Sequence, residues 1–329
     1  MQNNRMKAAV YHKYGSPDVI KIAEVSKPVP KEGEVLIKIH ASSVNAYDWH
    51  LLRAKPFFTR LISGIFKPKN NILGADIAGV VETTGKRFNA GDEVYGCLES
   101  CGKGGLASGG FAEYVCAKES VLALKPFRAS FEEAAALPMA AVTALQGLRD
   151  KGQVKPGQQV LINGASGGVG AFAVQIAKAY GAEVTGVCNS GSIAMVRSLG
   201  ADHVIDYITE NFTKTNKRYD LIMDIAANHS VKAYRYALKP GGVCVVVGFS
   251  TIRHMLNVAF SSKRDGKIIG TLMANNKNGD DLLDLNTLLE NGKLKIVIDS
   301  SYALSEVAEA IRHVETGHPK GKVIINNDR

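Results

Sequence analysis

Residues 160–180 read Val-Leu-Ile-Asn-Gly-Ala-Ser-Gly-Gly-Val-Gly-Ala-Phe-Ala-Val-Gln-Ile-Ala-Lys-Ala-Tyr. The run 160–162 is typical of a buried parallel strand, and apolar residues then recur at helical spacing up to Tyr180. Between them, Ala165, Gly167 and Gly170 occupy the three key positions of a G-x-G-x-x-G turn. Small residues there let phosphate oxygens approach backbone amides at the positive end of the helix dipole. This stretch therefore predicts a pyrophosphate-binding turn.

Strand and helix patterns continue to alternate after the turn. Strand candidates follow at 183–188, 204–205, 221–223 and 243–247, with an apolar helical segment at 195–199. Such alternation is typical of an α/β, doubly wound fold with a parallel sheet. No Gly-Lys-Ser/Thr follows the glycines, which disfavours a nucleoside-triphosphate site and favours a dinucleotide site.

The flanking regions have a different pattern, with short strand candidates separated by glycine and proline turns. They lie at 7–11, 35–40, 78–82, 93–95 and 111–116, and after residue 248 at 267–270 and 322–325, around helices near 280–289 and 305–313. With 329 residues, the chain exceeds the roughly 250–300 at which a single core stops growing. We therefore expect a second, β-rich domain.

Charge and cysteine usage exclude several classes of protein. The net charge is +9, but the basic residues are scattered and form no basic run, so no nucleic-acid partner is expected. The five cysteines include no C-x-x-C pair, which indicates a reducing, cytoplasmic location. No stretch has the length and apolarity of a signal peptide or a membrane span, so we expect no membrane partner.

Several ordered segments carry a family resemblance that covers nearly the whole chain. The segments are 41–49 (Ala-Ser-Ser-Val-Asn-Ala-Tyr-Asp-Trp), 73–80 (Leu-Gly-Ala-Asp-Ile-Ala-Gly-Val), 91–96 (Gly-Asp-Glu-Val-Tyr-Gly), 110–114 (Gly-Phe-Ala-Glu-Tyr), 134–138 (Ala-Ala-Ala-Leu-Pro) with Thr143-Ala144, the glycine turn, and 198–202 (Ser-Leu-Gly-Ala-Asp). In these segments the chain resembles the zinc-independent quinone oxidoreductase branch of the medium-chain dehydrogenase/reductase superfamily.

The resemblance implies a GroES-like β-barrel domain at both chain ends and a Rossmann domain between them, with the active site in the cleft. The expected segments are 1–128, 129–264 and 265–329. It also implies NADPH as cofactor and a homodimer. The cofactor-binding residues it implies, together with those of the turn, are Asn45, Thr143, Ala165, Ser166, Gly167, Gly168, Val169, Gly170, Gly248 and Phe249.

Zinc separates two chemistries within this superfamily. Alcohol dehydrogenation needs a Lewis acid, whereas a conjugated carbonyl can be reduced by hydride transfer alone. The metal-dependent relatives place a cysteine where this chain has Asn45, and their structural cysteine cluster is reduced here to Cys97 and Cys101. Because a structural zinc usually has four ligands, we interpret this pair as two isolated loop thiols and expect no metal.

The residues at the end of the second Rossmann strand should indicate whether the cofactor is NADPH or NADH. NAD-specific folds carry an acidic residue about 20 residues beyond the glycines. Residues 187–192 contain no carboxylate, and Asn189, Ser190 and Ser192 can donate hydrogen bonds to a 2′-phosphate. NADPH is therefore favoured over NADH. Tyr207 matches a family tyrosine near the adenosine, although it equally fits an aromatic capping the sheet edge.

Hydride addition to an enone leaves an enolate that needs a proton, and the candidate catalytic residues lie on one loop: Asn45, Asp48 and His50. Asn45 could hydrogen-bond the substrate carbonyl or the cofactor. Asp48 fits a role in holding the loop. His50 has a suitable intrinsic pKa, but its place between Trp49 and Leu51 is also typical of a packed residue. Related enoyl reductases carry a tyrosine where this chain has residues 55–57, so water is the favoured proton donor.

Segment 51–71 mixes large apolar residues, among them Phe57, Phe58, Leu61, Ile62, Ile65 and Phe66, with five basic ones. It fits an amphipathic surface helix packed on the domain or a lid over an apolar substrate. Taken together, the sequence predicts an NADPH-dependent, zinc-independent reductase of quinones or α,β-unsaturated carbonyls. The alternatives are an enoyl-thioester reductase, or a non-enzymatic NADPH-binding or RNA-binding protein of the zeta-crystallin type.

Overall fold

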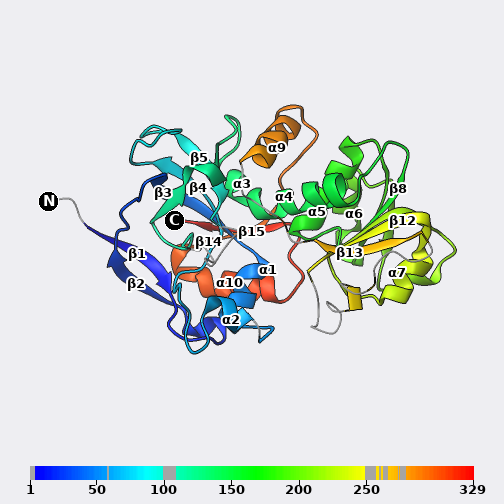
Figure 1. The fold of residues 1–329 in the computed structure, drawn as a ribbon, viewed down its shortest axis with the longest axis horizontal. Helices are drawn as coiled ribbons and strands as arrows, with labels where there is room; N and C mark the ends of the chain where they lie inside the picture. Colours follow the sequence, from blue (N-terminus) through cyan, green and yellow to red (C-terminus); the bar gives the residue numbers. More distant parts are fainter. Residues whose placement is uncertain are drawn as a thin grey trace. The chain divides into compact units, whose positions relative to one another are not determined.

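A computed structural model describes residues 4–57, 59–98, 109–248, 257–258, 261, 266–272, 274 and 279–329 of the chain. The chain divides into two compact units (Figure 1). Unit 1 comprises Met1–Met139, Asn275–Asn286 and Ile298–Arg329, and unit 2 comprises Ala140–Ala274 and Thr287–Val297.

Unit 2 contains a six-stranded parallel sheet in the order β10-β9-β8-β11-β12-β13. This is the doubly wound order 3-2-1-4-5-6 of dinucleotide-binding folds, so the predicted fold class is confirmed for this unit. The strands are β8 (Gln159–Asn163), β9 (Glu183–Cys188), β10 (His203–Asp206), β11 (Tyr219–Asp224), β12 (Leu238–Val247) and β13 (Ile268–Leu272).

Helices cover both faces of this sheet. Figure 1 shows α5 (Gly168–Ala179) and α6 (Ile193–Ser198) on one side of the strands and α7 (Val231–Ala237) on the other. Helix α5 packs on β8 and β9. It comes so close to the preceding turn that a Cβ atom on Gly170 would lie 2.0 Å from the carbonyl oxygen of Gly164. The third small residue of the motif is therefore required by packing.

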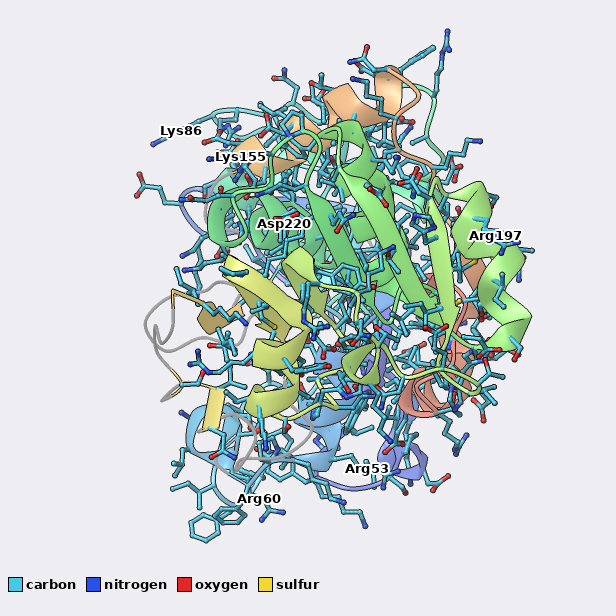
Figure 2. The ribbon with its side chains drawn as sticks, turned by 90° about the vertical axis from the view of Figure 1, so that its right-hand side faces the viewer. Arg53, Arg60, Lys86, Lys155, Arg197 and Asp220 are labelled. Carbon is cyan, nitrogen blue, oxygen red and sulfur yellow. The ribbon has the colours of Figure 1, made fainter. Side chains whose placement is uncertain are left out.

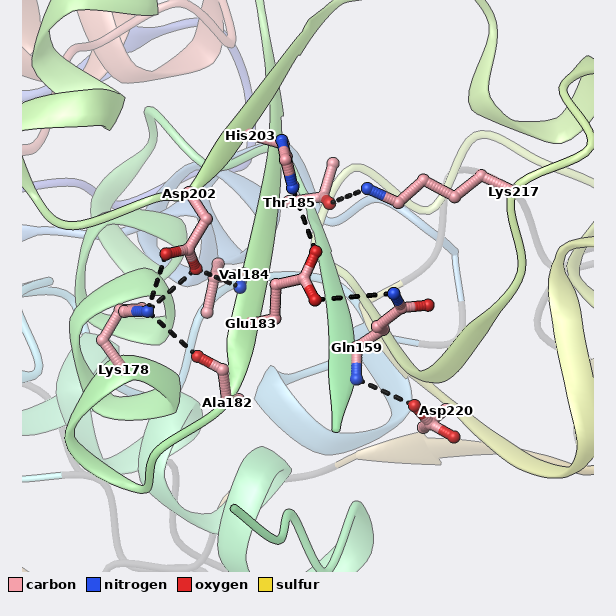
Figure 3. A network of polar contacts seen from close by, with 10 residues as sticks. All are labelled: Gln159, Lys178, Ala182, Glu183, Val184, Thr185, Asp202, His203, Lys217 and Asp220. Atoms are coloured by element: carbon pink, nitrogen blue, oxygen red, sulfur yellow. Dashed lines mark hydrogen bonds and ion pairs between the residues drawn. The ribbon is translucent and has the colours of Figure 1, made fainter. Parts of the chain in front are cut away.

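The amino ends of the parallel strands are tied together by polar contacts (Figure 3). The Asp202 carboxylate accepts from the Lys178 ammonium at 2.8 Å and from the backbone N–H of Val184 at 2.7 Å. His203 and Glu183 are 3.0 Å apart through Nε2 and Oε1. Since all strands of the sheet are parallel, this network lies at their amino ends, and the glycine turn follows β8 at the carboxyl ends.

Unit 1 is built on a seven-stranded sheet of order β14-β15-β3-β4-β5-β7, with β6 also pairing with β3, and on a separate pair β1-β2. All its pairings are antiparallel except β14 with β15. The strands are β1 (Arg5–Val10), β2 (Lys21–Ser26), β3 (Glu34–Val44), β4 (Asp76–Val81), β5 (Glu93–Cys97), β6 (Tyr114–Lys118), β7 (Leu122–Leu124), β14 (Ile298–Ala303) and β15 (Lys322–Asn326).

The helices of unit 1 are short. They are α1 (Ala46–Arg53), α2 (Thr59–Ser63), α3 (Phe131–Ala136) and α10 (Val307–Glu315), while α4 (Pro138–Gln146) and α9 (Asp280–Glu290) cross from one unit to the other. Among the helices that the structure describes, none combines the length and the apolar character that crossing a membrane requires.

Two expectations differ from the structure. The compact units change after Met139 and Ala274, whereas the expected domain boundaries lie after residues 128 and 264, and Thr287–Val297 joins unit 2. The physical reason is that β13 pairs with β12 and so belongs to the parallel sheet. Segment 51–71 is not one amphipathic helix, because α1 ends at Arg53 and the following Ala54 adopts a left-handed conformation with φ of 49°.

Replacing Gly170 with alanine should destabilise unit 2, because the new methyl group would overlap the Gly164 carbonyl. We expect a loss of about 1–3 kcal/mol in the free energy of unfolding, the usual effect of overpacking. Urea denaturation measures it. Gly270→Ala is the matched control, since a Cβ there meets nothing within 4 Å. Equal stability of the two variants would contradict the packing argument.

Candidate functional site

The loop that carries Asn45 begins where β3 ends, and strand register decides its neighbours. Strand β15 pairs with β3 so that Val323 lies opposite Val44, and β4 pairs so that Asp76 lies opposite Ser43. Lys322 and Asp76, the first residues of their strands, are thereby brought beside Asn45. All three side chains are buried, with exposed fractions of 3% for Lys322, 0% for Asp76 and 8% for Asn45.

These side chains form one hydrogen-bonded cluster. The Lys322 ammonium donates to Oδ1 of Asn45 at 2.5 Å and lies 3.6 Å from the Asp76 carboxylate. The Asn45 Nδ2 group donates to Asp76 at 2.9 Å and to the Ser43 carbonyl at 3.3 Å. Both amide hydrogens of Asn45 are thus directed at protein acceptors, and only its Oδ1 retains a free lone pair. As arranged, Asn45 can accept a hydrogen bond from a ligand but cannot donate one to a substrate carbonyl.

Asp76 is the hub of the cluster. Besides Asn45, its carboxylate accepts from the Ser43 hydroxyl at 2.9 Å and from the backbone N–H of Met139 at 3.0 Å. It therefore connects β3, β4 and the start of α4. Neither Asp76 nor Lys322 was predicted as a site residue from the sequence. A signal was present for Lys322, because a lysine that opens the apolar strand 322–325 needs a buried partner.

Burial governs the titration of this cluster. It lowers the pKa of Lys322, while the nearby carboxylates of Asp76 and Asp48 act in the opposite direction and favour the charged ammonium. Burial and the neighbouring carboxyl groups thus act on the Lys322 ammonium in opposite directions.

Asp48 holds the loop, as one of its expected roles requires. Its two carboxyl oxygens accept the backbone N–H of Asn45 at 2.8 Å and that of Gly74 at 3.0 Å. The side chain is fully buried, and burial raises its pKa to about 7. Both oxygens face backbone donors, so the contacts describe a positioning group and not a proton donor to a ligand.

His50 is packed in the same helix. Its ring stacks on Trp49 with centroids 3.6 Å apart, and Nδ1 lies 2.8 Å from the Lys55 carbonyl oxygen, which requires a proton on that nitrogen. Burial lowers the pKa of the imidazole. These contacts match the packed interpretation of His50. Its role as a catalytic acid stays a prediction that the structure does not test.

The glycine turn of unit 2 lies where the strand order of the sheet reverses, between β8 and β11. Ligands of open α/β sheets bind at the carboxyl ends of the strands at this point. Ser166, Gly167, Gly168 and Val169 are partly exposed there, whereas Ala165 and Gly170 are buried. Helix α5 begins at Gly168 with Gly167 as its cap, so its first amides have neither an intrahelical acceptor nor a capping side chain. A Cβ on Gly167 would lie 3.6 Å from Gly164 O and would project into this space.

A buried polar group supports the turn from the neighbouring strand. Asn163, the last residue of β8, donates from Nδ2 to Asp224 at 2.9 Å, and Tyr234 donates to the other Asp224 oxygen at 2.6 Å. Asp224 also accepts the N–H of Ala227 at 2.8 Å. These bonds fix the chain after β11 next to the turn. Thr143 lies in α4 and is buried, also within unit 2.

The end of β9 differs from its expectation in one respect. Residues 187–192 contain no carboxylate, but β10 pairs with β9 and brings Asp206 opposite Cys188. The Ser190 hydroxyl donates to Asp206 Oδ2 at 2.5 Å. The premise that no acidic side chain lies here is therefore wrong. Asp206 lies outside residues 187–192, and only the pairing of β10 with β9 brings it to this position. Asn189 is partly exposed and Tyr207 is half-exposed, while Ser192 is fully buried.

The remaining predicted residues lie at the edge of what the structure describes. Gly248 follows β12 and is exposed, with φ of 77°. Phe249 and Cys101 lie outside the described residues, and Cys97 is the buried last residue of β5 and not a loop thiol. In the described part of the chain, no three His, Cys, Asp or Glu side chains are grouped to hold a metal ion.

Family models match both parts of the chain. The alcohol dehydrogenase GroES-like domain matches residues 31–127, and the zinc-binding dehydrogenase model matches residues 199–325. The GroES-like domain predicted for the β-rich part is thereby confirmed. The second match lies mainly in the parallel sheet and the segments that follow it.

Whole proteins are similar over nearly the full chain. The chain is 38% identical to a 2-methylene-furan-3-one reductase of Solanum lycopersicum, covering 98% of this chain and 79% of that protein. It is 35% identical to the chloroplastic NADPH-dependent alkenal/one oxidoreductase of Arabidopsis thaliana, covering 97% and 79%. The structure of a quinone oxidoreductase from Coxiella burnetii superposes with a TM-score of 0.86 at 30% identity, covering 98% and 99%.

The raised pKa of Asp48 predicts that the stability of the protein depends on pH. Its pKa in the folded state, about 7, is above the ordinary value of 3.8, so folding favours the protonated form. The stabilisation is complete below the unfolded pKa and is lost as the pH rises through about 7. At about 1.4 kcal/mol per pKa unit, a few kcal/mol are involved. The free energy of unfolding of the wild type, relative to Asp48→Asn, should therefore fall between pH 4 and 8.

Urea denaturation at several pH values measures this difference. The asparagine variant can lose one backbone hydrogen bond, which lowers its stability equally at every pH. Only the slope of the difference reports the titration of Asp48. A difference that stays constant with pH would show that this carboxyl group does not titrate in this range.

Proposed function

Since this chain belongs to the medium-chain dehydrogenase/reductase superfamily, we propose that it is an NADPH-dependent, zinc-independent reductase of quinones or α,β-unsaturated carbonyl compounds. The carrying observation is the glycine turn at the strand-order reversal, where Gly167 is partly exposed and a Cβ on it would make only an ordinary contact with Gly164 O. The similar proteins, a 2-methylene-furan-3-one reductase, an NADPH-dependent alkenal/one oxidoreductase and a quinone oxidoreductase, support this choice of substrate. When bound, NADPH supplies the hydride.

Unit 2 would hold the dinucleotide through its backbone. The first amides of α5 can donate to the pyrophosphate, and the helix dipole favours its negative charge. Asn189 and Ser190 would contact the adenosine ribose or its 2′-phosphate. Because the Asp206 carboxylate lies against Ser190, we expect NADPH to be preferred over NADH only modestly, since that carboxylate opposes a 2′-phosphate.

The cluster of unit 1 supports a reaction without zinc. The Lys322 ammonium donates to the Asn45 amide oxygen and lies 3.6 Å from the Asp76 carboxylate, so hydrogen bonds and an ion pair among the protein's own side chains hold the cluster. Asn45 offers a neutral amide oxygen where the metal-dependent relatives place a cysteine ligand. Its remaining lone pair can accept from a donor such as an amide of the cofactor. Lys322 and Asp76 then act as positioning residues that hold the Asn45 amide in one orientation.

The cellular setting is part of the proposal. In the described part of the chain, Cys116, Cys188 and Cys244 are free thiols, which supports a reducing, cytoplasmic location. We also propose a homodimer. Strand β13 ends the order of the six-stranded sheet, and an edge strand can pair with the same strand of a second copy.

Gly167→Val should abolish binding of NADPH and leave unit 2 folded. The first side-chain atom meets only an ordinary contact at 3.6 Å, but the branched side chain fills the space that a pyrophosphate needs. Isothermal titration calorimetry with NADPH and NADH measures binding, and circular dichroism checks the fold. Gly270→Val is the matched control, because it adds the same side chain where a Cβ meets nothing within 4 Å. Tight NADPH binding by Gly167→Val would place the phosphates elsewhere.

Chelator-treated protein should consume NADPH when a quinone or an enone is added. On that protein we expect Asn45→Ala to lower kcat/KM by roughly 10–100-fold, because the acceptor at Oδ1 is lost. His50→Ala should change it much less, since its Nδ1 already binds a backbone carbonyl. Loss of NADPH absorbance, followed from about pH 5 to 9, measures both variants.

Elemental analysis of the same samples tests zinc-independence. A stoichiometric zinc that is required for turnover would overturn the metal-free proposal. An inactive His50→Ala beside an unaffected Asn45→Ala would exchange the two roles. NADPH binding without turnover of any quinone or enone would favour a non-enzymatic protein.

A further inference from the structure

The segment after α1 exposes an unusual number of large apolar side chains. Exposed fractions are 93% for Phe66, 68% for Phe57, 67% for Leu61 and 53% for Ile65. We call these four residues the apolar patch. The other exposed large apolar residues of unit 1, such as Val29 and Phe127, are far from it in sequence. Single exposed apolar side chains are ordinary, whereas a group of them marks a surface that binds something.

The patch is held out by an ordered turn. The Tyr14 hydroxyl donates to the Gly64 carbonyl at 2.6 Å and lies 3.0 Å from the Ser63 hydroxyl. The N–H of Lys69 donates to the Ser63 carbonyl at 2.8 Å. Gly64 has φ of 122°, and a Cβ there would lie 2.1 Å from the Lys67 carbonyl oxygen. Specific contacts therefore maintain the exposure of the patch.

Basic residues lie between and beside the patch residues in the sequence, and acidic ones are absent from the segment. Between Asp48 and Asp76, which are both buried, the sequence contains no Asp or Glu. Lys55, Lys67 and Lys69 are exposed.

Two arginines of the segment have partners already. Figure 2 labels Arg53 and Arg60 on the blue part of the chain. Arg53 pairs with Glu315 at 2.8 Å, and the Arg60 guanidinium lies 5.0 Å from the Tyr14 ring centre. The Arg53–Glu315 pair neutralises that acid, so the surface around the patch keeps the positive charge of its lysines.

These features select among possible occupants. A second copy of the chain would bring the same lysines against one another, which is repulsive. An anionic lipid surface meets both requirements, because phosphates attract the lysines and the acyl boundary accepts Phe57, Leu61 and Phe66. We propose that this segment docks unit 1 on an anionic lipid surface without spanning it. The proposal revises the expectation of no membrane partner and is independent of the proposed function.

Sedimentation with vesicles tests the proposal on the full-length protein. Vesicles of phosphatidylcholine with phosphatidylglycerol are compared with vesicles of phosphatidylcholine alone. We expect binding to the anionic vesicles only, and a loss of about tenfold or more in affinity for Phe57→Ser/Phe66→Ser. Phe127→Ser, which removes a 96% exposed phenylalanine of the same unit, should bind like the wild type. Thermal melts confirm that the variants are folded.

A charge variant separates the patch from the general basicity of the chain. Lys67→Glu/Lys69→Glu should weaken binding far more than Lys155→Glu/Lys214→Glu, which changes the net charge equally at two exposed lysines of unit 2. Equal effects of the two pairs would overturn the proposal, as would wild-type binding by Phe57→Ser/Phe66→Ser. So would light scattering that shows a wild-type oligomer which this serine variant dissociates, because the patch would then bind a second copy.

Discussion

The buried carboxylate of Asp76 is the constraint on which unit 1 depends. A charged group inside a protein is tolerated only if hydrogen bonds and an opposite charge surround it. Here a hydroxyl, a side-chain amide and a backbone amide donate to Asp76, and the Lys322 ammonium lies 3.6 Å away. The ends of three strands and the loop of Asn45 must therefore meet at this one point. The contacts that satisfy the buried charge of Asp76 are therefore also the contacts that assemble the candidate site.

Unit 2 meets a comparable constraint with small residues in place of charges. The turn after β8 must be open to a ligand on one side and closely packed on the other. Gly167 faces the open side, while Gly170 allows α5 to approach the Gly164 carbonyl. Asp224, bonded to Asn163 and Tyr234, fixes the neighbouring strand end. The rigid parallel sheet then keeps these backbone amides in place before any ligand arrives.

Local sequence patterns predicted some of the site residues and not others. The glycine turn was predicted from sequence because its requirements, namely a sharp turn, a free helix end and close packing, all lie within a few residues. The loop-holding role of Asp48 was foreseen for the same reason, since it caps the helix that it belongs to. Of the two interpretations of segment 51–71, the helix packed on the domain was wrong, because periodicity does not show that the chain turns at Ala54 and exposes Phe57 and Phe66.

The sequence by itself determined the α/β class, the order of strands and helices, and the position of the turn, since hydrophobic periodicity and small residues act over short distances. Only the tertiary structure decided which distant residues became neighbours. Antiparallel register placed Lys322 against Asn45, 277 positions away in the chain. Pairing of β10 with β9 placed Asp206 against Ser190. Strand pairing joins residues that are far apart in the chain, and it is determined by burial of whole sheet faces. No local pattern around Asn45 or Ser190 could therefore have predicted Lys322 or Asp206 as a partner.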